Sequence, residues 1–248
     1  MSFPPSFSGS FTFWTPAILG ADLALWLPPS GIIPGEGTAY GWYDSSLHHY
    51  NYVDAFDTGI TPTTTAALSN GLVGVVFDGV HDNNVIPTPL LPALLPNGTF
   101  HVFLVLKPTG PGDAAVPPQE GYSYIDDQAS TFGIYLNSPI AGPDQIYLEA
   151  DDDNFFGPYY AHGTVTPNTT TIVEGWQASD RILRVRVAGV TGTPSAVMPS
   201  AATFVGDFHI GTSPDCVIGE LILVNRSLTP TEQASMRAYL AAEWAVPA

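Results

Sequence analysis

Glycine and proline interrupt this chain throughout its length, with 24 residues of each among 248. Proline ends helices and is excluded from the interior of sheets, whereas glycine favours turns. Charged residues make up 12% of the chain, about half of the usual share of roughly 25%, so the charged faces of long surface helices cannot be built. The sequence therefore predicts short elements joined by many turns and excludes a mainly helical protein.

A packed core is nevertheless expected. The chain holds 13 Phe, 11 Tyr and 5 Trp, which bury far more apolar surface than a disordered chain carries. The length suits one large domain, which we place at residues 21–248. Residues 1–20 precede it as an N-terminal segment rich in Phe and Pro, which we expect to pack on the domain or to dock to a partner.

The charge balance restricts the partners. Acidic residues outnumber basic ones by 23 to 6, which gives a formal net charge of −17. Such a field repels phosphate backbones and anionic lipids, so no nucleic acid is expected as a partner. No run of about 18 apolar residues occurs, so no membrane insertion is expected. The single cysteine, Cys216, forms no internal disulfide, which fits folding in a reducing cytosol.

Apolar runs bounded by Gly, Pro and Asn predict the strands of an all-β fold. These runs occupy residues 23–27, 72–79, 100–107, 132–136, 145–150, 170–176, 181–187, 203–211 and 217–224. Three stretches without this pattern are expected to be loops, at residues 31–69, 87–98 and 154–160.

One helix is expected near the C-terminus. Thr229 is suited to be its N-cap, Pro230 fits the first helical position, and Glu232 completes a capping box. Apolar residues then recur at spacings of three and four, which predicts a stripe packed against a sheet. The stripe consists of Met236, Tyr239, Leu240 and Trp244.

Taken in order, these segments resemble the concanavalin A-like lectin/glucanase superfamily, and within it the laminin G-like jelly-roll domains found in phage and bacterial proteins. Five blocks carry the resemblance, at residues 14–31, 42–46, 70–82, 99–108 and 218–244. The resemblance implies a jelly-roll sandwich of two antiparallel sheets with one short C-terminal helix, and ligands on the concave face or its rim loops.

Two groups of aromatic residues are the candidate contact sites. Sugar recognition uses aromatic rings together with Asn, Asp and His, but the same residues also suit a protein interface or packing within the chain. One group contains Tyr40, Tyr43, His48, His49, Tyr50 and Tyr52, and the other contains Phe155, Phe156, Tyr159 and Tyr160. Next to these residues in the first segment, we expect Trp42 to fill a core pocket and Asp44 to cap a turn.

An acidic run raises the possibility of catalysis. Glucanases of this superfamily place three carboxyl groups on one strand face, and Glu149, Asp151 and Asp153 share that alternation. The last position is Asp, one methylene shorter than the Glu of the pattern, so the match fails at the acid/base. We therefore expect a solvated acidic strand end and no catalytic residue.

Metal binding is expected to be weak at most. The resemblance implies a possible calcium site with ligands from Asp78, Asp82 or Asn83, and a second one could use Asp151 and Asp153. The structural interpretation is that Asp78 and Asp82 make turn hydrogen bonds. The six histidines lack zinc-site spacing, and no other cofactor is expected.

The sequence thus predicts a non-catalytic structural or accessory protein of a phage virion, either a head decoration or a tail-associated adhesion module. Its partners would be virion structural proteins, a host surface glycan or both, and it would be a homo-oligomer or displayed in many copies. We expect the protein to be synthesised in the host cytoplasm, since no secretion signal is recognised, and to be located in the virion. The alternatives are a bacterial carbohydrate-binding module and a glucan-degrading glycoside hydrolase.

Overall fold

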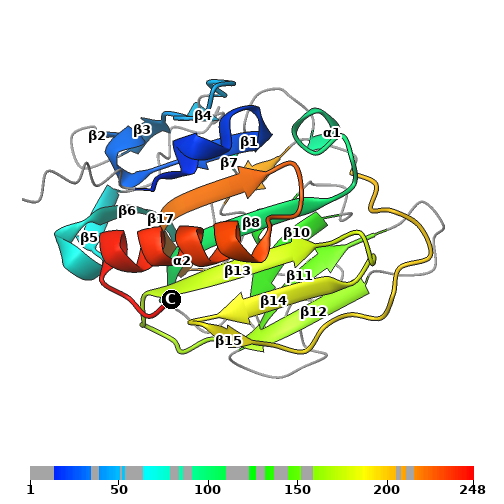
Figure 1. Ribbon diagram of the computed structural model, residues 1–248. Helices are drawn as coiled ribbons and strands as arrows, with labels where there is room; N and C mark the ends of the chain where they lie inside the picture. Colours follow the sequence, from blue (N-terminus) through cyan, green and yellow to red (C-terminus); the bar gives the residue numbers. More distant parts are fainter. Residues whose placement is uncertain are drawn as a thin grey trace, which may run out of the picture.

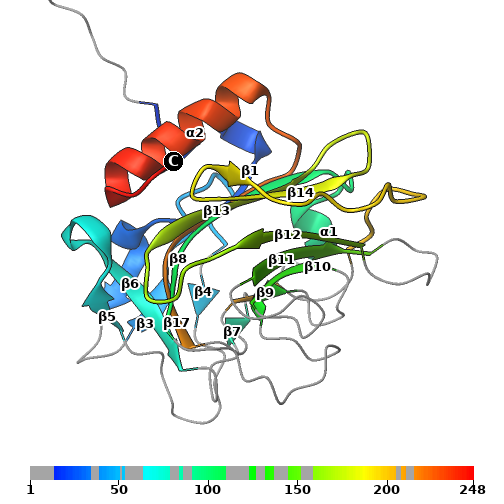
Figure 2. The ribbon, with the colours of Figure 1, turned by 90° about the horizontal axis from the view of Figure 1, so that it is seen from below.

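The chain folds into two antiparallel sheets that pack face to face, with one long helix on the outside. The computed structural model describes residues 14–34, 39–50, 52–53, 64–78, 84–85, 91–109, 123–126, 132–136, 145–151, 159–204, 208–210 and 215–248. Figure 2 shows helix α2, the larger sheet and the smaller sheet as successive layers. The predicted all-β sandwich with a C-terminal helix is confirmed.

The large sheet has eight strands in the order β15-β14-β13-β8-β17-β6-β5, with β1 also paired to β17 (Figure 1). Their bounds are β1 (Leu23–Leu27), β5 (Thr64–Ala67), β6 (Val73–Asp78), β8 (Phe100–Pro108), β13 (Thr171–Gln177), β14 (Leu183–Val187), β15 (Val190–Thr191) and β17 (Asp215–Val224). The long apolar strands β8 and β17 form its centre.

The small sheet has six strands in the order β12-β11-β10-β9-β16-β7. Their bounds are β7 (Asn84–Val85), β9 (Ser123–Asp126), β10 (Phe132–Leu136), β11 (Gln145–Ala150), β12 (Tyr159–Thr164) and β16 (His209–Ile210). At its β12 edge, His162 and Thr193 exchange two backbone hydrogen bonds, at 3.0 and 2.8 Å. Because Thr193 follows β15, this bridge joins the small sheet to the large one.

Short elements complete the fold. A third sheet of three strands consists of β2 (Ile32–Pro34), β3 (Ala39–Trp42) and β4 (Tyr52–Val53). The helical turns are η1 (Pro16–Asp22), η2 (Pro29–Gly31), η3 (Ser69–Gly71) and α1 (Leu91–Leu94), and the long helix is α2 (Pro230–Trp244). No helix among the described residues is long and apolar enough to cross a membrane.

The main core lies between the two sheets. Phe100, Phe132 and Phe204 pack edge to face, with ring centroids 5.1 to 5.8 Å apart, in the geometry that aromatic quadrupoles favour. A Cβ added at Gly175 of β13 would lie 3.1 Å from Leu148 of the small sheet. Glycine at this position therefore lets the two sheets approach closely.

Helix α2 covers the outer face of the large sheet and buries a second core. The capping box forms as predicted, because Thr229 accepts from the Glu232 backbone and the Glu232 side chain accepts from the Thr229 backbone. Met236, Leu240 and Trp244 are fully buried, so the predicted stripe is confirmed. The packing of these side chains, rather than helix propensity alone, positions α2.

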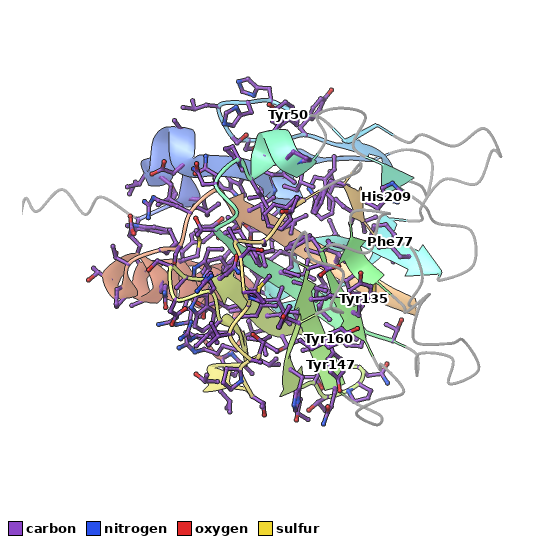
Figure 3. The ribbon with its side chains drawn as sticks, turned by 90° about the vertical axis from the view of Figure 1, so that its right-hand side faces the viewer. Tyr50, Phe77, Tyr135, Tyr147, Tyr160 and His209 are labelled. Carbon is purple, nitrogen blue, oxygen red and sulfur yellow. The ribbon has the colours of Figure 1, made fainter. Side chains whose placement is uncertain are left out.

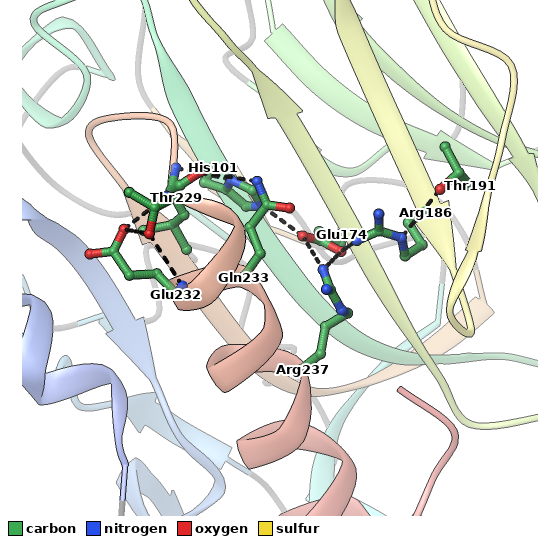
Figure 4. Close-up of polar contacts among 9 residues, drawn as sticks. His101, Glu174, Arg186, Thr191, Thr229, Glu232, Gln233 and Arg237 are labelled. Atoms are coloured by element: carbon green, nitrogen blue, oxygen red, sulfur yellow. Dashed lines mark hydrogen bonds and ion pairs between the residues drawn. The ribbon is translucent and has the colours of Figure 1, made fainter.

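A buried polar cluster lies under the start of α2 (Figure 4). The backbone N–H of Leu228 donates to Nδ1 of His101, so the ring proton lies on Nε2, which donates to Glu174 at 2.9 Å. Arg186 and Arg237 bind the Glu174 carboxylate at 2.6 and 2.9 Å. Burial opposes ionisation of Glu174, but the His101 hydrogen bond and the two arginines outweigh it and lower its pKa.

Several sequence predictions need correction. Residues 31–69, predicted as a loop, contain β2 to β5, which are too short to show an apolar alternation. Within 87–98, α1 forms one helical turn with Pro92 at its second residue, a position that tolerates proline because first-turn N–H groups have no helical partner. Of the strand predicted at 203–211, the described residues contain only β16.

Candidate functional site

The outer face of the small sheet gathers aromatic and acidic side chains. On β11, Ile146 and Leu148 point into the core. Because side chains alternate along a strand, Tyr147 and Glu149 point outward. The outward side chains of β10, β11 and β12 form a surface that we call the tyrosine face. It consists of Tyr135, Gln145, Tyr147, Glu149, Tyr160 and His162.

Glu149 lies at the middle of one row of this face. It is opposite Gly133 of β10 on one side and opposite Tyr160 of β12 on the other. A Cβ added at Gly133 would lie 2.4 Å from the Tyr135 ring, closer than packed atoms approach. Because Gly133 has no side chain, the Tyr135 ring can lie over Gly133 on the same strand. The end of the ring is therefore in the row that holds Glu149.

Tyr147 is the centre of the next row. Its ring is perpendicular to that of Tyr160, with centroids 6.1 Å apart, and stacks near His162 at 5.6 Å. The Tyr147 hydroxyl donates to Oε1 of Gln145 at 2.8 Å. Tyr135 lies directly opposite Tyr147, and Figure 3 shows Tyr135, Tyr147 and Tyr160 grouped in one part of the molecule. Tyr147 itself is 4% exposed, so Tyr135, Tyr160 and His162 are the half-exposed rings of the group.

The phenols of this face keep their protons. Burial and the charges of Glu149 and Asp151 raise the pKa of Tyr160 to about 12, and burial raises the pKa of Tyr147. Both hydroxyls are therefore hydrogen-bond donors at neutral pH, whereas Glu149, which is 8% exposed, is an acceptor. The face thus combines ring surfaces with both kinds of hydrogen-bonding group.

The carboxyl run predicted on one strand face is not continuous. Strand β11 ends at Ala150, and Asp151 follows it half-buried. Glu149 is buried rather than part of a solvated strand end, which corrects that expectation. Asp153 lies outside the described residues. Glu149 is therefore the one member of the expected triad that the structure places on a strand.

The chain over residues 43–50, which we call the Asp44 loop, is the second candidate. The Asp44 carboxylate accepts from the backbone N–H groups of Trp26, Ser46 and Tyr50 and from the Ser46 hydroxyl, at 2.6 to 2.9 Å. These four hydrogen bonds fix the turn, so the predicted role of Asp44 as a cap is confirmed. Trp42, just before the loop, is fully buried, as predicted.

The Asp44 loop carries several of the predicted contact residues. Tyr43 and Leu47 are 53% and 70% exposed. His48 and His49 are exposed as well, and the rings of His48 and Tyr50 stack with centroids 5.4 Å apart. The loop therefore presents aromatic and aliphatic side chains to solvent from a fixed backbone.

The described members of the two predicted aromatic groups lie apart. Figure 3 shows Tyr50 at one end of the molecule and Tyr160 toward the other. Tyr159 is half-buried and packs against the core. Tyr40 and Tyr52 lie in β3 and β4, and the positions of their side chains are outside the described structure. Phe155 and Phe156 also lie outside the described residues.

The predicted metal ligands are largely outside what the structure describes. Asp78 ends β6, where its backbone pairs opposite Asp215. Asp82, Asn83 and Asp153 are not among the described residues. Within the described ranges, no three His, Cys, Asp or Glu side chains gather where they could hold an ion. Calcium binding stays a prediction.

Much of the tyrosine face was not predicted from the sequence. Of its members, Tyr160 was predicted as a contact residue and Glu149 was considered only for catalysis. Tyr135, Tyr147 and His162 were missed because strand pairing, which no single segment reveals, brings them together. A signal was present on β11, where Tyr147 and Glu149 alternate with Ile146 and Leu148.

The fold is shared with solved structures of low sequence identity. The binding domain of Paraclostridial Mosquitocidal Protein 1 has a TM-score of 0.61 at 9% identity, over 90% of this chain and 53% of that one. The binding domain of botulinum neurotoxin DC in complex with SialylT gives 0.53 at 10%, over 87% and 50%. Trypanosoma rangeli sialidase in complex with sialic acid gives 0.54 at 15%, over 90% and 33%.

These likenesses show a β-sandwich fold. The chain spans about a third of the sialidase chain and about half of each toxin chain. No family model and no curated protein matches the sequence.

Proposed function

We propose that this protein is a lectin-like module that binds a glycan on the tyrosine face and does not cleave it. The observation that carries the proposal is the position of the Glu149 carboxylate beside the Tyr160 phenol on an outward sheet face. Sugars present C–H surfaces that pack on aromatic rings and hydroxyls that need both donors and acceptors. The tyrosine face offers all three kinds of contact.

The arrangement favours binding over hydrolysis. Retaining glucanases use two carboxyl groups about 5 to 5.5 Å apart, one of them as the acid, whereas sialidases use a tyrosine as the nucleophile. On the described strands of the face, Glu149 is a single carboxylate at the position of the expected triad. A bound sugar would therefore accept a hydrogen bond from the Tyr160 hydroxyl and donate one to the Glu149 carboxylate.

The comparisons support a glycan as the ligand class. Two of the proteins with this fold were solved with sialic acid or with SialylT. The resemblance of the sequence to concanavalin A-like and laminin G-like domains points the same way. At identities of 10 to 15%, neither likeness carries a binding site over residue by residue.

The finer proposal is a virion module of a bacteriophage, displayed in several copies. Single-site sugar affinities near the millimolar range correspond to about −4 kcal/mol, and multivalent display can strengthen binding by a factor of about 10² without new contacts. A bacterial carbohydrate-binding module is the alternative. Mass spectrometry of purified virions would distinguish them, because a virion protein is recovered with the particles and a bacterial module is not.

The Asp44 loop suits attachment to a protein partner. Its exposed Leu47 and Tyr43 sit on a backbone fixed by four hydrogen bonds, so little conformational entropy is lost on binding. Leu47→Asp should release the module from its particle without changing glycan binding. Retention on the particle would exclude this role for the loop.

Glycan binding is tested with Tyr160→Ala and Tyr160→Phe in a glycan array and by titration. We expect Tyr160→Ala to abolish binding, and Tyr160→Phe to weaken it by the loss of one hydroxyl contact. The matched control is Tyr43→Ala, which removes an exposed tyrosine from the Asp44 loop. Equal binding by Tyr160→Ala and Tyr43→Ala would show that the ligand binds elsewhere.

A further inference from the structure

No Lys or Arg lies on the strands that carry the tyrosine face. The chain contains six Lys and Arg residues, and all six are among the described residues. They are Lys107, Arg181, Arg184, Arg186, Arg226 and Arg237. None belongs to a strand of the small sheet, and the segments outside the description contain no Lys or Arg either.

The strand cations point to the opposite side of the sandwich. On β14, Val185 and Val187 face the core between the sheets, so Arg184 and Arg186 point toward the α2 side. On β8, Leu106 faces the same core, and Lys107 therefore also points toward α2.

Four of the arginines are engaged by carboxylates. Arg186 and Arg237 hold Glu174, and Arg226 joins Asp22 to Glu232 on the α2 side of the molecule. Arg184 pairs with Asp180. Arg181 donates to the backbone carbonyl of Pro199.

The tyrosine face itself is acidic. Glu149 is buried in it, and Asp151 is close enough to act on Tyr160, since both carboxylates contribute to the raised pKa of that phenol. A charge that enters a partly desolvated site is screened less than one in open solvent. An anionic ligand group here would meet negative charge and no counter-charge.

We infer that the tyrosine face takes glycans without acidic groups and rejects those whose contacting residue carries a carboxylate or a sulfate. This inference rests on the proposed function and adds the ligand class. Carboxylate recognition in proteins relies on Arg or Lys, with Arg preferred for its paired donors. The tyrosine face has neither, so an acidic sugar would lose its water without gaining an ion pair.

The expected ligand of this chain differs from that of a protein that shares its fold. The Trypanosoma rangeli sialidase was solved with sialic acid, a sugar that carries a carboxylate. A common sandwich therefore does not imply a common ligand. On this chain, the charge distribution favours the uncharged counterpart of such a glycan.

The test is a glycan array of matched pairs that differ only in a terminal sialic acid or a sulfate, probed with the whole chain. We expect binding to uncharged members and at least tenfold weaker binding to their acidic partners. Most of the difference should persist as salt is raised to about 0.5 M, because charges in a partly desolvated site are screened little and lost hydration is not restored by salt.

Two variants and one control test whether the tyrosine face causes the discrimination between uncharged and acidic glycans. Thr164, exposed on β12 and opposite Gln145, is replaced in Thr164→Arg, which should improve binding of the acidic partners severalfold. Glu149→Gln should reduce the discrimination. Glu243→Gln makes the same charge change on α2 and should leave it unchanged.

The outcomes separate this inference from the proposed function. Equal or tighter binding of acidic partners that Tyr160→Ala abolishes would overturn the inference and keep the glycan-binding function. Binding of no glycan of either kind would overturn both. Because Thr164 is exposed, Thr164→Arg should fold and melt like the unmodified chain, so its readout does not depend on Glu149 variants being stable.

Discussion

The indole nitrogen of Trp244 donates to Oε2 of Glu220 across 2.8 Å, which joins the last residue of α2 to a central strand of the large sheet. Trp26 and Tyr239 donate to the other oxygen, at 2.8 and 3.0 Å. Burial raises the pKa of Glu220 against the effect of these three hydrogen bonds. A fully buried carboxyl group thus depends on donors that α2 supplies.

We predict that removal of the chain after Leu228 abolishes folding. The truncation exposes the sheet beneath α2 and removes Met236, Leu240 and Trp244, each of which contributes roughly 1.5–3 kcal/mol by burial. Glu220 also loses two donors. Because a domain is stable by only about 5–15 kcal/mol, the product should aggregate or unfold. A soluble fragment with a cooperative melting transition would contradict this prediction.

Trp244→Phe removes the indole N–H together with part of the buried ring. Glu220 loses one donor and the smaller phenyl ring leaves a cavity, so the free energy of unfolding should fall by at least about 1–3 kcal/mol. Chemical denaturation at neutral pH measures the loss. The comparison is Trp14→Phe, at a half-buried tryptophan whose ring centroid lies 6.5 Å from that of Tyr239. This substitution should lower the free energy of unfolding less.

Acidification should destabilise the protein through His101. Burial lowers the pKa of His101 below its usual value of 6.5, so the unfolded chain binds its proton more readily. The contribution of neutral His101 to the free energy of unfolding is therefore complete above about pH 6.5. It decreases as the pH falls below that value, by at most about 1.4 kcal/mol per pH unit. In His101→Gln, the denaturation midpoint should change less between pH 7.5 and 5.5. An unchanged slope would assign the pH dependence to other groups.

Glu232 adds a second step at lower pH. The hydrogen bond from Arg226, with those from Thr229, lowers the pKa of Glu232 to about 2. Its stabilisation is therefore present above its unfolded pKa of about 4.3 and is lost as the pH falls toward 2. Glu232→Gln should remove this step in acid titrations followed by circular dichroism. The same loss of stability in the variant would contradict the assignment.

Gly133→Ala should weaken glycan binding without unfolding the protein. The added methyl group would overlap the far end of the Tyr135 ring, and that ring can swing away more easily than the backbone can move. Affinity should fall severalfold while the melting temperature changes little. In a double-mutant cycle with Tyr135→Ala, the two losses should not add. Additive losses would mean that Gly133 acts through other residues.

No hydrolysis of laminarin, lichenan, agarose or carrageenan is expected. Glucanases use a pair of carboxyl groups, and on the described strands of the face Glu149 occupies one position of the expected triad. Assays of reducing-end release should stay at background with the whole chain. Release that disappears in Glu149→Gln would reverse this prediction and make the protein a glycoside hydrolase.

The sandwich could be predicted from the sequence because its central strands can be recognised from their local residue pattern alone. Residues 100–107 and 217–224 are mainly apolar and β-branched or aromatic, with few polar residues, and they form β8 and most of β17. The helix could be predicted because Thr229 and Glu232 form a local capping box. Strand β12 was missed because Tyr159–Thr164 lacks an apolar run and becomes a strand through its pairing with β11.

The tyrosine face could be predicted only in part, since its rows depend on register. Nothing local relates Gly133 to Glu149 or Glu149 to Tyr160, and a shift by one residue would turn all of them inward. The Asp44 turn was predicted correctly because its hydrogen bonds to Ser46 span only two residues. The exposure of Leu47, in contrast, follows from how the loop sits on the fold.

The bridge between His162 and Thr193 limits the pairing of strand β12 with strands of other molecules. Strand β12 is the last strand of the small sheet, and a bare sheet edge is a template on which a strand from another molecule can add. At His162, both backbone groups are already bonded to Thr193, which interrupts the template in the middle of β12. Neighbouring copies packed at high density would therefore not polymerise through this edge, and the tyrosine face beside it would stay open to ligand.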